Sequence, residues 1–111
     1  MTEPLSVTES LNVDTLALLT LAHPEIDWTM TTVRVVVEQT NAVHVTLNTT
    51  RGYISVNAAT LADVPRVMTK HGKHEKRSWA RTIYADKQLL TQVTAMANDM
   101  LRGTRTCASA D

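Results

Sequence analysis

Three segments in the middle of the chain alternate between apolar and polar side chains. They are residues 32–38, 43–47 and 53–57, and short turns at 40–41 and 49–52 separate them. A period of two is typical of strands that bury one face. Short turns between consecutive strands favour antiparallel pairing. The pattern therefore predicts an antiparallel meander whose inward residues are Val33, Val35, Val37, Val43, Val45, Leu47, Ile54 and Val56.

Before the meander, apolar residues recur near helical spacing. Leu16, Leu19 and Ala22 precede Pro24, while Ser6 and Glu9 have the spacing of a capping box. We expect a helix within residues 7–23, with Asn12 or Asp14 as alternative starting points.

Two more helices are predicted after the meander. Residues 61–71 follow a cap at Thr60 or Asp63, have Pro65 in the first turn and stop at Gly72. The last helix starts at Asp86 and ends near Gly103. Its apolar stripe is Leu89, Leu90, Val93, Met96, Ala97, Met100 and Leu101.

These elements predict an α+β fold, in which helices pack on one face of a three-stranded meander and the C-terminal amphipathic helix is the longest. Residues 78–84 also alternate and fit a fourth strand or an extended loop. One domain is expected over residues 1–103, followed by a flexible tail at 104–111. A three-stranded sheet leaves two edges, which a homodimer would close by pairing strands or stacking helices.

Composition is ordinary for a globular protein, with 43 % hydrophobic and 20 % charged residues. We expect no membrane partner, because no apolar run approaches the roughly 18 residues of a membrane helix. The first ten residues do not resemble a secretory signal, and the single cysteine, Cys107, cannot form an internal disulfide. A cytoplasmic location is therefore expected.

The net charge is zero, but the charges are segregated along the chain. Residues 1–50 contain one cation and six acids, whereas residues 51–111 contain ten cations and five acids. The two halves thus carry formal charges of −5 and +5. Residues 66–81 hold six of the cations and one acid, Glu75. Such a stretch is typical either of a solvated loop or of a surface that binds a polyanion.

Candidate binding residues in this basic segment supply donors for phosphate oxygens, and one aromatic ring could stack on a base. They are Arg66, Lys70, His71, Lys73, His74, Lys76, Arg77, Trp79 and Arg81.

No motif in the chain specifies a reaction. His71, His74 and Glu75 are too few for a closed zinc site, and neighbouring lysines would repel a cation. His44 and Thr46 share one strand face, but a phosphoesterase of the two-histidine type needs a second such pair. Three glycines are too few for a phosphate-cradling loop. We therefore predict no catalytic residues, no metal and no cofactor.

The sequence favours a small, non-catalytic regulatory protein that docks through residues 66–81 on a polyanionic partner. Nucleic acid, DNA or RNA, is the favoured polyanion. The alternative is a protein-binding regulator or inhibitor of phage or mobile-element type, which would act through the basic segment, on an acidic protein surface, or through the acidic first half.

Overall fold

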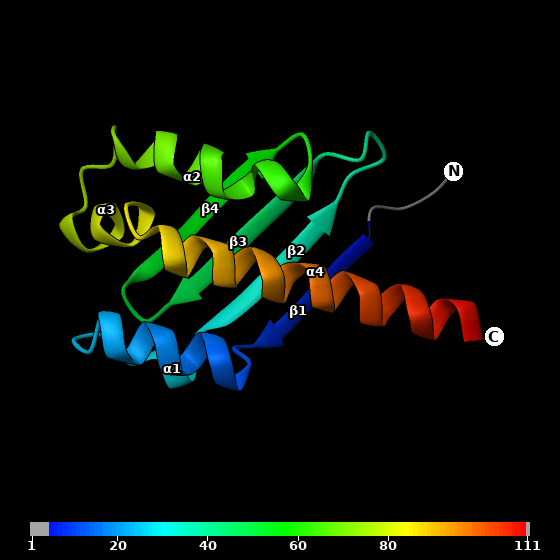
Figure 1. The fold of residues 1–111 in the computed structure, drawn as a ribbon, viewed down its shortest axis with the longest axis horizontal. Coiled ribbons are helices and arrows are strands. Elements are labelled where there is room, and N and C mark those ends of the chain that lie inside the picture. The colour runs from blue at the N-terminus through cyan, green and yellow to red at the C-terminus, as the bar shows by residue number, and fades with distance from the viewer. Residues whose placement is uncertain (1–4, 111) are drawn as a thin grey trace.

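The computed structural model describes the backbone of residues 5–110 and the side chains of residues 5–103. Figure 1 shows four strands and four α-helices. The order is β1 (Leu5–Ser10), α1 (Val13–Ala22), a 3₁₀ turn (Trp28–Met30), β2 (Thr32–Val37), β3 (Val43–Thr49), β4 (Gly52–Ala58), a 3₁₀ turn (Leu61–Asp63), α2 (Val64–Gly72), α3 (Ser78–Tyr84) and α4 (Lys87–Ala110).

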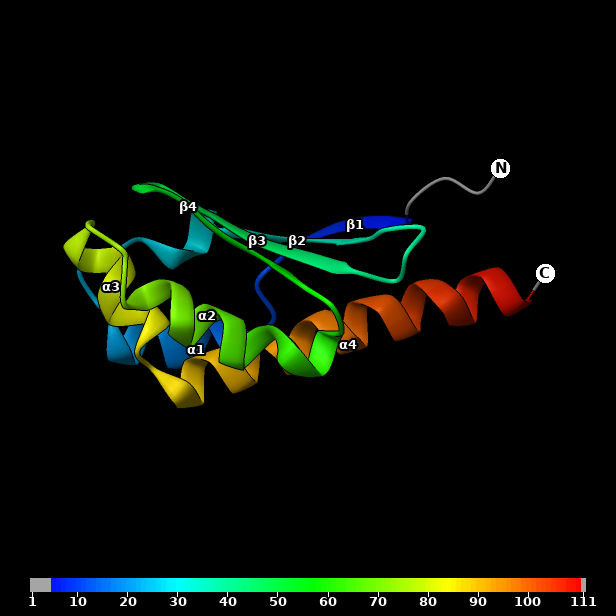
Figure 2. The same cartoon turned by 90° about the horizontal axis from the view of Figure 1, so that it is seen from above.

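The sheet is an antiparallel meander in the order β1-β2-β3-β4. The predicted α+β class and the three central strands are confirmed. All helices lie on one face of the sheet, so the molecule has two layers, as the turned view shows (Figure 2). The inward residues of the three central strands are buried except Val37, which is partly buried; α2 packs on β4, and α4 packs on β1 and β2. Each fully buried valine or leucine contributes about 1.5–3 kcal/mol of apolar burial.

The register gives the sheet one apolar and one polar face. Val33 pairs with Leu47, and Leu47 pairs with Ile54; all three are buried. The intervening row, Thr8, Arg34, Thr46 and Ser55, faces away from the helices. The expected position of His44 and Thr46 on one open sheet face is therefore confirmed.

The start of the predicted first helix is wrong, because residues 5–10 form β1. Ser6 and Glu9 do not make a capping box; they pair with Val36 and Val33 of β2. The short alternation of Leu5 and Val7 with polar residues adds a fourth strand to one sheet edge. Helix α1 begins after Asn12, the alternative start, whose side-chain oxygen accepts a hydrogen bond from the Thr15 amide at 2.9 Å.

Residues 78–84 form helix α3, so the prediction of a strand or an extended loop there is wrong. Ala80, Ile83 and Tyr84 are buried, and their i, i+3, i+4 spacing places them on one helical face. The same segment also alternates in a period of two, and seven residues are too few for periodicity to decide.

Helix α4 starts as predicted, with the Leu89 amide donating to the Asp86 carboxylate at 3.1 Å. Its stripe is buried from Leu89 to Leu101 and packs across β1, β2, α1, α2 and α3. The backbone remains helical to Ala110, past the predicted end at Gly103. The flexibility expected for residues 104–111 stays a prediction, and Asp111 lies outside the described residues.

Gly72, the last residue of α2, lies directly against Tyr84 of α3. A Cβ atom at this position would lie 2.7 Å from Cβ of Tyr84. The predicted stop at Gly72 thus has a packing reason: only a residue without a side chain leaves room for Tyr84.

Gly72→Ala is expected to lower the free energy of unfolding by about 1–3 kcal/mol, because the added methyl group overpacks the α2–α3 contact. Urea unfolding followed by circular dichroism measures this. Gly103→Ala is the matched control: nothing lies within 4 Å of the added Cβ, and alanine favours the helix by up to about 1 kcal/mol. Equal effects of the two substitutions would contradict the close approach.

Candidate functional site: the basic segment

The basic segment, residues 66–81, spans most of α2, the loop 73–77 and the first half of α3. It lies at one end of the helix layer, beside the β3–β4 turn (Figure 1). The structure divides its cations into a group held by protein partners and a group that projects into solvent.

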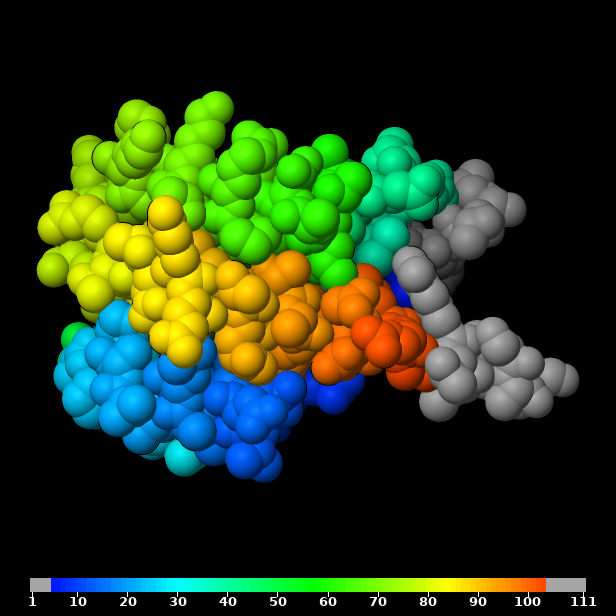
Figure 3. All heavy atoms as spheres, in the orientation of Figure 1, coloured from blue at the N-terminus to red at the C-terminus, as the bar shows by residue number. Residues whose placement is uncertain are grey.

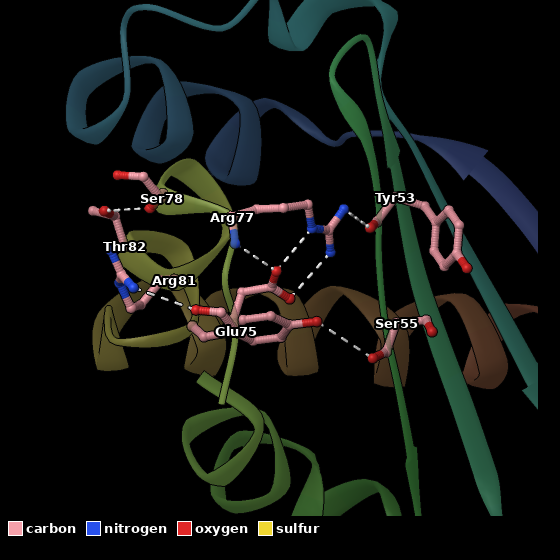
Figure 4. A network of polar contacts seen from close by, with 8 residues as sticks. Tyr53, Ser55, Glu75, Arg77, Ser78, Arg81 and Thr82 are labelled. Carbon is pink, nitrogen blue, oxygen red and sulfur yellow. Dashed lines mark hydrogen bonds and ion pairs between the residues drawn. The ribbon is translucent and has the colours of Figure 1, made fainter. Parts of the chain in front are cut away.

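Arg77 is the most tightly held of these cations. Its guanidinium donates to both carboxylate oxygens of Glu75, from Nε at 2.8 Å and from Nη2 at 3.2 Å. Nη1 donates to the Tyr53 carbonyl on β4 at 3.0 Å. The Arg77 amide also donates to Glu75 at 2.9 Å. Figure 4 shows the loop joined to the sheet through this one side chain.

Trp79 packs beneath Arg77, so its ring is not free to stack on a base. Its ring is partly buried against the core, and the guanidinium carbon of Arg77 lies 5.1 Å from the ring centroid, within cation–π range. The β3–β4 turn lies against the pair: a Cβ on Gly52 would be 3.4 Å from Arg77 and 3.6 Å from Trp79. Gly52 has φ +127°, so glycine is favoured there for its backbone as well.

Three further residues of the segment also have protein partners. Arg81 donates to the Glu75 carbonyl at 3.4 Å, and Arg66 lies 3.6 Å from Asp63. Both arginine side chains remain exposed. The His71 ring stacks on Tyr84 at a centroid distance of 6.4 Å.

Lys70, Lys73 and Lys76 form the group that projects into solvent. All three are exposed, and none makes an ion pair with any residue the structure describes. Exposed His74 lies in the same loop. We call Lys70, Lys73 and Lys76 the lysine cluster. Glu75, the only acid of the segment, does not neutralise the cluster because its carboxylate is bound to Arg77.

One cation that sequence reasoning missed lies close to this segment. Lys87, at the start of α4, lines a shallow hollow of about 260 Å³ together with Arg66 of α2. The two residues are 21 positions apart, so only the packing of α2 on α4 brings them together. The position of Lys87 off the apolar stripe of the last helix indicates that it is exposed, but the sequence does not show that Arg66 is its neighbour.

The remaining sequence candidates do not assemble into a further site. His71 and Glu75 are engaged with Tyr84 and Arg77, and no three histidine, cysteine, aspartate or glutamate side chains converge as metal ligands within the described residues. The Cys107 side chain lies outside the described part.

Comparisons with known proteins do not assign a family. No family model matches the chain, and neither a curated protein nor a solved structure shows significant similarity to it. None of the helices in the described part combines the length and apolarity that a bilayer span requires. Function is therefore inferred from the residues and their geometry.

Hydrogen bonds from the Arg77 side chain and amide hold the pKa of Glu75 at about 2, below its ordinary value of 4.5. Burial raises the pKa of the neighbouring Tyr84. The first shift shows that the loop conformation favours an ionised Glu75.

Glu75→Gln is expected to destabilise the protein at neutral pH, and the difference from the wild type should shrink at low pH. Because the folded-state pKa is depressed, the contribution is present above pH 4.5 and is lost as pH falls towards 2. Urea midpoints measured across this range test the expectation. Glu38→Gln, at an exposed residue with no ion pair in the described part, is the control. A difference between wild type and Glu75→Gln that is independent of pH would contradict it.

Proposed function

We propose that the protein is a small, non-catalytic binding protein of the cytoplasm that docks on nucleic acid through the lysine cluster. The observation that supports this is the exposure of Lys70, Lys73 and Lys76 without a carboxylate partner among the described residues. When such lysines contact phosphates, counterions are released from the nucleic acid, and no ion pair within the protein has to break first.

The local structure supports a phosphate-binding role. Lys70 and Lys73 are three positions apart at the C-terminal end of α2, so their side chains are neighbours on the helix surface. Lys76 follows in the loop that Glu75 and Arg77 hold against the sheet. Arg66 on α2, Arg81 on α3 and Lys87 on α4 are also exposed and extend the positive surface onto these three helices.

We expect contacts to the backbone of the nucleic acid and little sequence preference. The three lysines present point charges on a helix end and loop, and base readout needs a side chain that reaches base edges. Trp79 has no stacking role in this proposal, because Arg77 lies over its ring. His71 and His74 lie between members of the cluster along the chain, and both are exposed.

The alternative function is a regulator that binds another protein, and one observation supports it independently. Val13 and Leu21 on α1 are 81 % and 83 % exposed. Large apolar side chains at that exposure are typical of a contact surface when they fall on one stripe. The basic segment would then face an acidic protein surface.

Replacing Lys70, Lys73 and Lys76 together with glutamine is expected to weaken binding to labelled single-stranded and duplex DNA and RNA. Each lost phosphate contact lowers the slope of log K against log salt by about 0.7–0.9, so the triple variant should lose about 2–3. Fluorescence anisotropy between about 50 and 200 mM salt measures both quantities.

The matched control replaces Arg34, Arg51 and Arg102 with glutamine, which changes the net charge equally but leaves the lysine cluster intact. It should retain more of the salt slope than the lysine variant. Absence of binding by the wild type at the lower salt would overturn the nucleic-acid proposal and favour the protein-binding alternative. If both triple variants lose the same affinity and the same salt slope, the protein attracts nucleic acid through its overall charge, and the lysine cluster is not the binding site.

A further inference from the structure

Helix α1 presents an apolar stripe to solvent on the side opposite the core. Val13, Ala17 and Leu21 recur every four residues and are all exposed, whereas Thr15 and Leu19 on the other side are fully buried. The helix is therefore apolar around most of its circumference, unlike a helix that packs only on its own sheet. The stripe needs no partner inside this chain, since the core is complete without it.

The surroundings of this stripe are acidic. No lysine or arginine occurs before Arg34, and the cation that folding brings to this region is Arg51, whose guanidinium donates to the Glu25 carbonyl at 3.4 Å. Asp14 lies on α1 itself, and Glu25 and Asp27 follow the helix; all three are exposed. A partner for this surface should therefore combine apolar contacts with positive charge.

A surface with those properties lies on the same face of the same molecule, between α2 and α4. Figure 3 shows α2 and α4 side by side on the helix face, with α1 on the other side of α4. A hollow of about 520 Å³ is lined by Leu61, Ala62, Pro65 and Ala95 together with polar side chains of α4. The adjoining hollow shares Pro65 and Thr91 with it and is lined by Arg66 and Lys87.

We propose that the α1 stripe and this α2–α4 groove are the two halves of a homodimer interface. In the dimer, α1 of each subunit would lie in the α2–α4 groove of its partner. The exposed Val13 and Leu21 would fill the apolar hollow, and the acids around α1 would approach Arg66 and Lys87. The occupant of the groove is a second copy of this chain.

The arrangement of the helix layer allows this contact to close with two-fold symmetry. Helices α1 and α2 lie on opposite sides of α4, and all three are on the same face of the sheet (Figures 1 and 2). A two-fold axis along the direction of α4 places each α1 opposite the partner's α2. The same contact then forms twice, and the assembly ends at a dimer instead of growing into a filament.

Charge complementarity favours a second copy over an unrelated partner. In the proposed dimer, Asp14 of α1 and the acids that follow the helix would face Arg66 and Lys87 of the groove, all of which are exposed. Arg66 already lies 3.6 Å from Asp63, so Lys87 is the groove cation without a carboxylate partner among the described residues. An α1–α1 contact would instead bring like charges together. The interface leaves out Lys70, Lys73 and Lys76, so it does not depend on the proposed nucleic-acid binding.

The first test is sedimentation equilibrium of the full chain without nucleic acid. We expect a dimer whose dissociation constant rises at least ~10-fold when Val13 and Leu21 are both replaced with serine, because their apolar contacts are lost. Tyr53→Ser removes a residue that is 61 % exposed on the open sheet face and should leave the constant unchanged. A wild type that stays monomeric up to about 300 µM overturns the proposal.

The second test is a charge swap. Asp14→Lys with Glu25→Lys, and Arg66→Glu with Lys87→Glu, should each give a monomer, because α1 and groove then carry the same sign. An equimolar mixture should restore a dimer, since both contacts become complementary. Neither pair alters the buried core, so restoration on mixing excludes unfolding as the cause of the loss.

The control mixture pairs Glu9→Lys/Glu38→Lys with Arg34→Glu/Lys76→Glu, which have the same net charges but lie outside the proposed contact. Arg51 is unsuitable as a control because its guanidinium donates to the Glu25 carbonyl at 3.4 Å. Each control variant should dimerise alone as the wild type does. If the test variants and the control variants change the dissociation constant of the dimer equally, the proposed interface is wrong, and overall charge attraction between the subunits explains the dimer. A dimer that forms normally while nucleic acid does not bind would refute only the proposed function.

Discussion

A sheet that is apolar on one face alone is the constraint from which the rest of the structure follows. Four strands alternate in register, so their inward residues form one continuous apolar surface. A surface of that size must be covered, and every helix therefore lies on the same side (Figure 2). The outward rows carry mainly serine, threonine, asparagine, Arg34 and His44, which water can solvate, together with Val36 and the exposed Tyr53. Both proposed binding surfaces therefore lie in the helix layer.

Within that layer, one acid decides which cations are available. The Glu75 carboxylate accepts three hydrogen bonds from Arg77, two from the guanidinium and one from the amide, and Arg77 in turn donates to the Tyr53 carbonyl of β4. This pair fixes the loop between α2 and α3 against the sheet. Because the carboxylate is fully used, Lys70, Lys73 and Lys76 are left without a local counter-charge among the described residues. The same pair that orders the loop thus leaves the lysine cluster available to an external anion.

The lysine cluster lies outside the proposed dimer contact and differs from it in chemistry, although Arg66 and Lys87, which extend the positive surface, would be covered by that contact. The lysine cluster is a group of exposed point charges, suited to a flexible polyanion whose contacts need no fixed geometry. The α1 stripe and the α2–α4 groove combine apolar area with opposite charges, which suits a contact of defined geometry. Their separation means that dimerisation would bring two lysine clusters into one assembly without covering either. Binding to a long polyanion would then gain from two linked sites.

The sequence alone determined the class of the fold, the three central strands, the cap of α1 at Asn12 as an alternative, and the start of α4. These features depend on local periodicity and capping, which neighbouring residues encode. Strand β1 and helix α3 were missed for a common reason. Each is only six or seven residues long, and the decisive contacts, Val7 with Val35 and Gly72 with Tyr84, join distant parts of the chain.

The sequence also showed the basic segment, but it did not show which of its cations have protein partners and which project into solvent. Whether a cation is held or available depends on which partner lies within reach, and that is set by packing. Arg77 meets Tyr53 across 24 positions, and Arg66 shares a hollow with Lys87 because α2 lies on α4. The sequence by itself determined that residues 66–81 are basic. Only the tertiary structure decided that Lys70, Lys73 and Lys76 remain exposed without a counter-charge in the described part. The reason is that ion pairs form between groups that are close in space, whatever their separation along the chain.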